Sequence, residues 1–256
     1  MWSLNFSDLS RSWLDDRLSW LSAEEQRTAG RHRFRYAYLA GKLFFRCLLS
    51  HYCDLPVHRL PLAYGAYGKP LLQGFDLSFN LSHSRDGAVM AVSRQRRLGI
   101  DVEELSRSID IESIASEYFD EAETRCLDSA ADSERPWSFL YLWTLKEAFF
   151  KALGSGLSDD ISRVRFRLGD GRIAMEVVDG TECPRDWQFA LWQNPHSLRG
   201  RCSVALAYEG RKSLPVVWFD GSRLMSGAPP EGVTCVPYML SRAVDDLSRR
   251  PEPMVL

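Results

Sequence analysis

Apolar residues recur at helical intervals in two stretches of the chain. Residues 22–50 begin with Ser22 and have Glu25 three positions later, the spacing of a capping box at the start of a helix. The apolar positions that follow predict one or two helices. Residues 109–153 return to this periodicity and are followed by Gly154, a residue typical of the position just after a helix. The pattern therefore predicts two separate helical regions.

Short apolar runs between and after these regions predict β-strands. FDLSFNLSHS and residues 87–105 lie between the helical regions, and in residues 87–105 two runs flank the polar segment SRQRR, which predicts a hairpin. Residues 163–179 contain two runs around LGDG, and WQFALWQ and CSVALAY could add two further strands. The order of helix followed by strands therefore occurs twice.

This repeated order predicts an α+β fold made of two similar α/β lobes. The lobes would span residues 1–104 and 105–210 and would join just after LGIDVEE. Residues 211–256 include GAPPEG and RRPEPMVL and are rich in Pro and Gly. We expect them to form a partly ordered C-terminal extension of unknown role.

Composition narrows the class of protein. The chain has 256 residues, 45% of them hydrophobic, and can bury a sizeable core. Its formal charge of −2 gives no global bias towards nucleic acid or an anionic membrane. No apolar run approaches the roughly 18 residues that a membrane span needs. The six cysteines form no CxxC pair, and MWSLNFSDLS does not resemble a secretory signal, so we expect free thiols in the cytoplasm.

Asp101 and Glu103 are unusual residues for the apolar strand LGIDVEE. Alternate residues of a strand share a face, so both carboxylates point to one side, and Ile100 and Val102 point to the other. Two carboxylates on one face can share a hard divalent cation such as Mg²⁺, which prefers oxygen ligands. Most such pairs are solvated surface charges, so a metal site here needs support from other segments.

The segment LWTLKEAFFKALG places an acid and a base on one face of a predicted helix. Glu147 and Lys151 are four positions apart, which favours an ion pair. Aromatic and aliphatic neighbours indicate that part of this helix is buried. An acid that could complete a metal's ligands, beside an ammonium that could neutralise phosphate oxygens, suits phosphoryl chemistry. A surface salt bridge is the simpler alternative.

Small polar and cationic groups suited to a polyanionic ligand occur earlier in the chain. NLSHS contains Ser82, His83 and Ser84, and because no G-x-S-x-G elbow is present, phosphate contacts are favoured over a hydrolytic triad. A structural histidine is the alternative reading. Further cations are Arg31, Arg33, Arg35, Lys42, Arg46 and Lys69. The absence of a G-x-x-x-x-G-K-[ST] loop and of a dinucleotide fingerprint disfavours ATP hydrolysis and nicotinamide binding.

Four segments follow one another in order: YGKP, FNLSHS, LGIDVEE and LWTLKEAFFKALGSGL. In this order they resemble the 4′-phosphopantetheinyl transferases of the surfactin-synthetase-activating type, the larger pseudo-dimeric class. The resemblance runs from about Leu21 to Leu157, and the separation of Asp101 from Glu147 also fits that family. Four ordered motifs are more specific than any one of them.

The resemblance implies two α/β lobes related by a pseudo-twofold axis, with coenzyme A in the cleft between them. Asp101, Glu103 and Glu147 would hold Mg²⁺, or Mn²⁺, against the pyrophosphate of coenzyme A. The groups implied to act in catalysis are Glu147, Lys151 and His83, of which Lys151 would meet the pyrophosphate and leaving group. Lys69, Ser82 and His83 match positions that contact the coenzyme's phosphates. The candidates for its 3′-phosphate are Arg31, Arg33, Arg35 and Lys42.

The implied reaction moves the 4′-phosphopantetheine arm from coenzyme A to a serine of an apo acyl or peptidyl carrier protein and releases adenosine 3′,5′-bisphosphate. Glu147, directly or through a water, would take the serine proton. The implied protein is a monomer with internal pseudo-symmetry, without nucleic-acid or membrane partners. Two alternatives stay open, namely a non-catalytic scaffold that binds carrier or coenzyme and a Mg²⁺-dependent phosphohydrolase.

The charge of the middle segment is unusual for a protein expected to bind acidic carriers. Twelve acids and only two arginines lie between Asp101 and Glu134. Because like charges resist docking, we expect the carrier to bind through an apolar patch and the basic first-lobe helix. The acidic segment would then face away from it.

Overall fold

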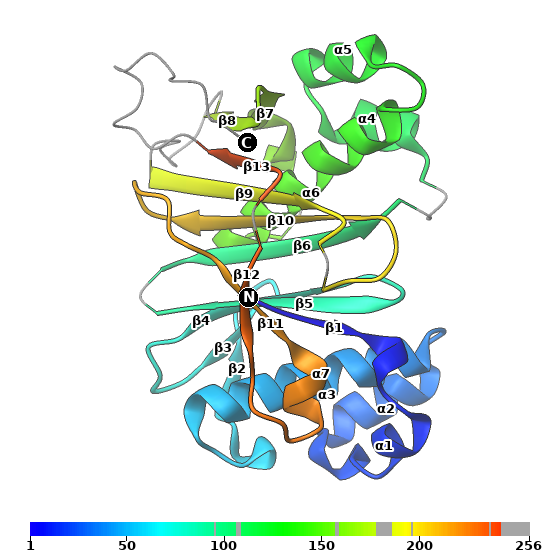
Figure 1. The fold of residues 1–256 in the computed structure, drawn as a ribbon, viewed down its shortest axis with the longest axis vertical. Helices are drawn as coiled ribbons and strands as arrows, with labels where there is room; N and C mark the ends of the chain where they lie inside the picture. The colour runs from blue at the N-terminus through cyan, green and yellow to red at the C-terminus, as the bar shows by residue number, and fades with distance from the viewer. Residues whose placement is uncertain are drawn as a thin grey trace.

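A computed structural model describes residues 1–94, 96–105, 109–156, 159–177, 186–195, 197–235 and 237–241. Two sheets lie at the centre of the fold, with helices beyond each of them (Figure 1). The structure is therefore mixed α+β, as the sequence predicts.

The first sheet combines strands from the beginning, the middle and the end of the described chain. In spatial order its strands are β12 (Gly232–Thr234), β11 (Val217–Asp220), β1 (Trp2–Asn5), β5 (Gly87–Ser93) and β4 (Ser78–His83). The helices beside it are α1 (Arg11–Asp15), α2 (Ala23–Arg31), α3 (Arg35–Cys53) and α7 (Gly221–Met225), and a separate ribbon pairs β2 (Leu62–Tyr64) with β3 (Pro70–Leu72). Short 3₁₀ helices occupy Phe6–Asp8, Leu18–Trp20 and Val57–Arg59.

The second sheet begins with the strand that carries the two carboxylates. In spatial order its strands are β6 (Leu98–Glu104), β10 (Cys202–Glu209), β9 (Trp187–Gln193), β13 (Met239–Ser241), β8 (Arg172–Val177) and β7 (Val164–Gly169). Its helices are α4 (Ile111–Tyr118), α5 (Glu121–Ser129), α6 (Arg135–Leu153) and the 3₁₀ helix Asp159–Arg163. Helix α6 packs along β6 and β10.

An apolar core joins the two sheets. Ile100 and Val102 of β6 are buried there together with Val89 of β5 and with Trp192 and Trp218 from β9 and β11. Figure 1 shows β5 and β6 side by side where the sheets meet. The side chains of Ile100 and Val102 therefore occupy one face of β6, and the other face is left to Asp101 and its neighbours, as the alternation predicts.

The structure confirms both predicted helical regions and their end signals. The Ser22 hydroxyl accepts the Glu25 backbone N–H at 3.2 Å, and the Glu25 carboxylate accepts the Ser22 N–H at 2.9 Å, which completes the capping box. Gly154 follows α6 with φ of 74°, a left-handed conformation that glycine adopts easily. The hairpin around LGDG is also confirmed, as β7 paired with β8.

The hairpin predicted for residues 87–105 is wrong. Both strands exist, but β5 pairs with β4 and β1, and β6 pairs with β10, where Asp101 lies opposite Ala205. The polar segment between β5 and β6 therefore carries the chain from one sheet to the other. A turn-like sequence specifies a change of direction but not the partner strand.

Some predictions concern how the chain divides into parts. β6 closes the predicted residues 1–104 yet lies in the second sheet, and β11, α7 and β12 of the predicted extension lie with the first sheet. The lobe boundaries stay a prediction.

Cys47, Cys53, Cys126, Cys202 and Cys235 are free, and Cys183 lies outside the described residues. None of the helices in the described ranges has the length and hydropathy of a membrane span.

Candidate active site

The close approach of α6 to β6 brings the motif residues together. A Cβ atom at Gly99 would lie 2.8 Å from the backbone carbonyl carbon of Lys151. This distance is shorter than real Cβ atoms show, so only glycine fits at this position. Glycine at this position lets the strand and the helix touch. The residues that follow it on the same face of β6 therefore reach α6 directly.

Three elements meet at Asp101. Its Oδ1 atom lies 2.6 Å from Lys151 Nζ on α6 and accepts a hydrogen bond of 2.8 Å from Ser82 Oγ on β4. Lys151 Nζ also donates to Ser82 Oγ at 3.1 Å. Asp101 is 2% exposed, whereas about a third of the Lys151 side chain is exposed. The Lys151 ammonium thus pairs with a carboxylate that is itself shielded from solvent.

The second carboxylate oxygen of Asp101 is not used in these contacts. Oδ2 is buried and has no hydrogen-bond partner within the part of the chain that the structure describes. An unpaired buried carboxylate oxygen is costly unless something binds it. Carboxylate oxygens are ligands that Mg²⁺ favours, so the donor chemistry of Asp101, Glu103 and Glu147 fits that ion. Across the described ranges, however, no three or more His, Cys, Asp or Glu side chains already form a metal-binding group.

The charges of the site influence one another. Burial, together with the nearby Asp101 carboxylate, raises the pKa of Glu147 to about 7, and Lys151 opposes this shift. Burial by itself lowers the pKa of Lys151, but the carboxylates of Asp101, Glu147 and Glu103 outweigh it and hold that pKa above its usual value. Lys151 therefore stays charged at neutral pH, whereas Glu147 can exchange a proton there.

Asn80 is a residue of the site that the sequence analysis did not single out. It is 7% exposed on β4, and its Oδ1 atom accepts the backbone N–H of Ile100 at 2.8 Å. This bond fixes the backbone just before Asp101 to a strand of the other sheet. The amide of NLSHS was visible in the sequence, but its partner is twenty positions away.

Lys69 lies at the end of α6. Its Nζ atom donates to the carbonyl oxygens of Lys151 at 2.6 Å, Ala152 at 2.9 Å and Leu98 at 3.1 Å. All three ammonium hydrogens are therefore used, and a cation at a helix C-terminus is stabilising. Burial lowers the pKa of Lys69 to about 8, with a further contribution from Arg97.

His83 borders a hollow of about 350 Å³ between α3 and β4, which we call the His83 hollow. Lys42, His32 and Tyr38 also line it, and Gly68 and Pro70 from the YGKP segment close one side. Burial lowers the pKa of His83, and Lys151 adds to that shift, so the imidazole is mainly neutral at pH 7. His32, which stacks on Tyr38 with ring centres 5.1 Å apart, is a second imidazole that the sequence analysis missed.

The structure separates the remaining basic candidates. Lys42 lies at the His83 hollow, and its ammonium is 4.0 Å from the Glu25 carboxylate. Arg33 and Arg35 line a different hollow, and Arg31 is exposed at the end of α2. A larger hollow of about 600 Å³ adjoins the His83 hollow, because Tyr38, Lys42 and Tyr64 line both, and one of about 770 Å³ lies elsewhere. Neither is lined by Asp101, Glu103, Glu147 or Lys151. The carboxylates, Lys151, Ser82 and His83 thus lie near one another, without Arg31, Arg33 and Arg35.

A family model described as the 4′-phosphopantetheinyl transferase superfamily matches residues 97–207. That range covers β6, α6 and β10, and so includes Asp101, Glu147 and Lys151. The protein 4′-phosphopantetheinyl transferase psf-1 of Bacillus pumilus is 31% identical over 175 residues, which cover 66% of this chain and 74% of that protein. The chain belongs to this superfamily. The resemblance drawn from the four motifs is confirmed.

Other relatives agree. The 4′-phosphopantetheinyl transferase HetI of Nostoc sp. is 35% identical over 158 residues, covering 59% of this chain and 67% of that protein. A human L-aminoadipate-semialdehyde dehydrogenase-phosphopantetheinyl transferase is 30% identical over 207 residues, which cover 70% of this chain and 67% of that protein. A solved holo-[acyl-carrier-protein] synthase of Thermotoga maritima overlaps 47% of this chain and 66% of its own, with 27% identity and a TM-score of 0.35. That overlap is too small to bear on the fold.

Proposed function

We propose that this chain transfers 4′-phosphopantetheine from coenzyme A to a serine of an apo carrier protein, with Mg²⁺ or Mn²⁺, and releases adenosine 3′,5′-bisphosphate. The observation that carries the proposal is the contact of Asp101, Lys151 and Ser82, which leaves Asp101 Oδ2 buried and without a hydrogen-bond partner among the described residues. Membership of the superfamily supports it. The coenzyme would lie between the two lobes, which we propose to be related by a pseudo-twofold axis in a monomer.

Asp101, Glu103 and Glu147 are the residues proposed to hold the metal ion. A divalent ion bound there would neutralise charge on the diphosphate of the coenzyme. Lys151 offers a second positive charge at the same place, because the acids around it keep its ammonium protonated. Ser82 holds Asp101 through its hydroxyl. These side chains are fixed by β4, β6 and α6 before any ligand arrives, which favours catalysis.

Glu147 is proposed to accept the proton of the attacking serine. A pKa of about 7 allows its carboxylate to be present at neutral pH and still to bind a proton during the reaction. The nucleophile belongs to the carrier protein, so the free cysteines of this chain need no catalytic role.

The phosphates of the coenzyme are proposed to lie from Lys151 to the His83 hollow. His83, Ser82 and Lys42 are the nearby groups that suit them. Lys69 would act by holding the end of α6, and with it Lys151, since its three N–H bonds already reach backbone carbonyls.

In the decisive experiment, a purified apo-acyl carrier protein is incubated with the enzyme, coenzyme A and Mg²⁺, and the molecular mass of the carrier is then measured by mass spectrometry. We expect a gain equal to one phosphopantetheine group. Release of inorganic phosphate without that gain would indicate a phosphohydrolase. No change in either, with coenzyme still bound, would indicate a scaffold.

Replacement of Asp101 tests the metal assignment. Asp101→Asn keeps an oxygen for the Ser82 hydroxyl but removes the charge, so we expect transfer to fall at least about a hundredfold with little loss of stability. Binding of Mn²⁺, followed by electron paramagnetic resonance without substrates, should weaken in parallel. Glu104→Gln is the matched control, because Glu104 lies on the same strand but accepts the Asp86 backbone N–H. Unchanged Mn²⁺ affinity in Asp101→Asn would refute the ligand assignment.

A further inference from the structure

The hollow lined by Arg33 and Arg35 has a volume of about 470 Å³ and lies on the first-sheet side of the molecule. We call it the arginine hollow. Four arginines and two aspartates line it together with Phe34 and neighbouring residues of α1 and α3. The charged residues are Arg11, Arg33, Arg35, Arg85, Asp15 and Asp86, all exposed. They come from α1, from the junction of α2 and α3, and from the turn between β4 and β5. Three separate parts of the chain thus converge on it.

Within the described ranges, none of the four arginines of this hollow forms an ion pair. Some arginines elsewhere do, for example Arg46 with Glu25 at 2.8 Å and Arg135 with Glu112 at 2.7 Å. The two aspartates leave a net positive surface. Unpaired guanidinium groups favour carboxylates, which they can bind with two parallel hydrogen bonds.

Phe34 gives the hollow an apolar centre. Its side chain is 47% exposed, and the guanidinium carbons of Arg33 and Arg85 lie 5.2 and 5.9 Å from its ring centre. The two cations hold the ring in place through cation–π contacts. Aromatic residues flanked by arginine are typical of the centres of protein interfaces. The chemistry suits an apolar side chain surrounded by acids.

The arginine hollow adjoins the candidate active site. His32 and His83 line the His83 hollow, whereas Arg33, Phe34 and Arg85, one or two positions further on, line the arginine hollow. Neighbouring residues of the same two segments therefore line the two hollows. The Asp86 backbone N–H also donates to Glu104 at 3.1 Å, which attaches the turn after β4 to the end of the strand that carries Asp101. A protein bound at the arginine hollow would lie beside the carboxylates.

We propose that the arginine hollow docks the carrier protein, with an apolar side chain of the carrier against Phe34 and its acids against the arginines. This inference rests on the proposed function, because the carrier must approach the diphosphate with its serine. It assigns Arg33 and Arg35 to the protein partner and leaves the 3′-phosphate of the coenzyme to the His83 hollow. The two aspartates disfavour a continuous polyanion such as nucleic acid or an anionic bilayer.

The test uses the double variant Arg11→Glu/Arg85→Glu. We expect its KM for an apo-acyl carrier protein to rise about tenfold, with kcat and the Kd for coenzyme A within about twofold of wild type. The matched control is Arg27→Glu/Arg59→Glu, which makes the same change in net charge at exposed positions outside the hollow. Phe34→Ala should raise KM about fivefold by itself. Circular dichroism checks that each variant folds.

Three outcomes would overturn the proposal. The control could raise KM as much as the double variant, which would show a general charge effect. The double variant could weaken coenzyme A binding, measured by calorimetry without carrier, which would make the hollow a phosphate site. It could also leave KM unchanged while losing binding to phosphatidylserine vesicles, which would make it a membrane contact. Absence of a phosphopantetheine mass gain with wild type is a separate result that defeats the proposed function itself.

Discussion

Glu147 combines two demands that conflict in its environment. Burial beside Asp101 favours its protonated form, whereas the proposed role in metal binding or proton transfer needs its carboxylate. Its pKa of about 7 lies above its ordinary value of 4.5, so the folded protein binds this proton more tightly than the unfolded chain does. The contribution of protonated Glu147 to the free energy of unfolding is therefore fully present below pH 4.5 and is lost as pH rises through about 7.

This pH dependence predicts how Glu147→Gln changes the free energy of unfolding. Without added metal, the variant should gain on the order of 1–2 kcal/mol over wild type at pH 8 and almost nothing at pH 4.5. Thermal unfolding in EDTA at the two pH values measures the difference. Glu24→Gln, at an exposed position of α2, is the control and should show the same small change at both. An advantage of Glu147→Gln that does not grow with pH would contradict the raised pKa.

At the scale of elements, the contact between β6 and α6 depends on Gly99. An added methyl group would meet the α6 backbone, which cannot move like a side chain, so Gly99→Ala should force the strand and helix apart. We expect a loss of about 1–3 kcal/mol of stability and a large loss of transfer, since Asp101 and Lys151 would separate. Denaturant unfolding and the mass-gain assay measure the two effects.

A second glycine serves as the control. Gly30 lies in α2, and a methyl group added there would meet no atom within 4 Å, so Gly30→Ala should stabilise the protein by about 0.5–1 kcal/mol. If Gly99→Ala behaved like Gly30→Ala, the close approach of β6 and α6 would not be needed for activity.

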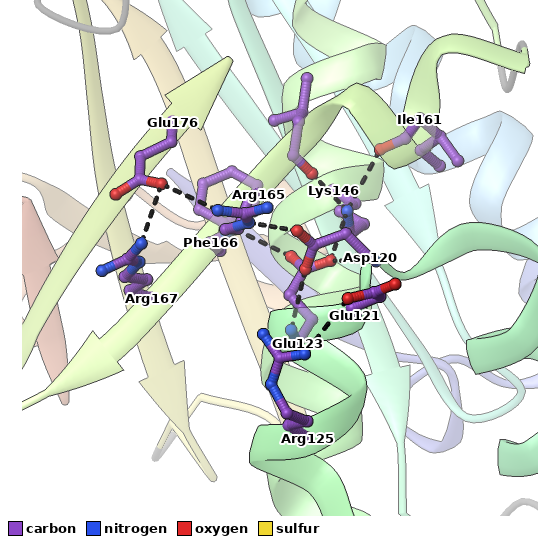
Figure 2. A network of polar contacts seen from close by, with 11 residues as sticks. Asp120, Glu121, Glu123, Arg125, Lys146, Ile161, Arg165, Phe166, Arg167 and Glu176 are labelled. Carbon is purple, nitrogen blue, oxygen red and sulfur yellow. Dashed lines mark hydrogen bonds and ion pairs between the residues drawn. The ribbon is translucent and has the colours of Figure 1, made fainter. Parts of the chain in front are cut away.

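The other face of α6 is fixed by a buried ion pair (Figure 2). Lys146 and Glu123 are fully buried, with Nζ and Oε2 2.9 Å apart, and Lys146 also donates to the carbonyls of Ile161 and Val164. Glu123 accepts the Phe166 backbone N–H at 2.8 Å. The pair therefore joins α5, α6 and β7. Burial lowers the pKa of Lys146 and raises that of Glu123, so each partner relies on the other to remain charged.

Removal of one partner should be costly. Lys146→Met leaves the Glu123 carboxylate buried without its cation, and we expect a loss of about 3–5 kcal/mol in the free energy of unfolding. Arg125→Met, which breaks the exposed pair of Arg125 and Glu121 in the same region, should change little. Equal effects of the two variants in urea unfolding would show that the buried pair does not hold α6.

Whole-molecule organisation shows what local sequence patterns can and cannot predict. The position of Glu147 relative to Lys151 follows from helical spacing, and the common face of Asp101 and Glu103 follows from strand alternation, so the sequence predicted both. The pairing of β6 with β10 joins residues about a hundred positions apart, and no local pattern encodes it. The same holds for Lys69 and Asn80, whose partners lie in other elements.

The C-terminal region is the clearest case of a whole-molecule effect, because its Pro and Gly content predicted a partly ordered extension without indicating what it contacts. Trp218 of β11 is 2% exposed in the core between the sheets, with its ring centre 5.4 Å from that of Trp192. We therefore expect Trp218→Ala to lower the free energy of unfolding by about 3–5 kcal/mol, as measured in urea. Val233→Ala in β12, where Val233 is 64% exposed, should have little effect. A stable Trp218→Ala would mean that the core between the two sheets does not depend on the Trp218 side chain.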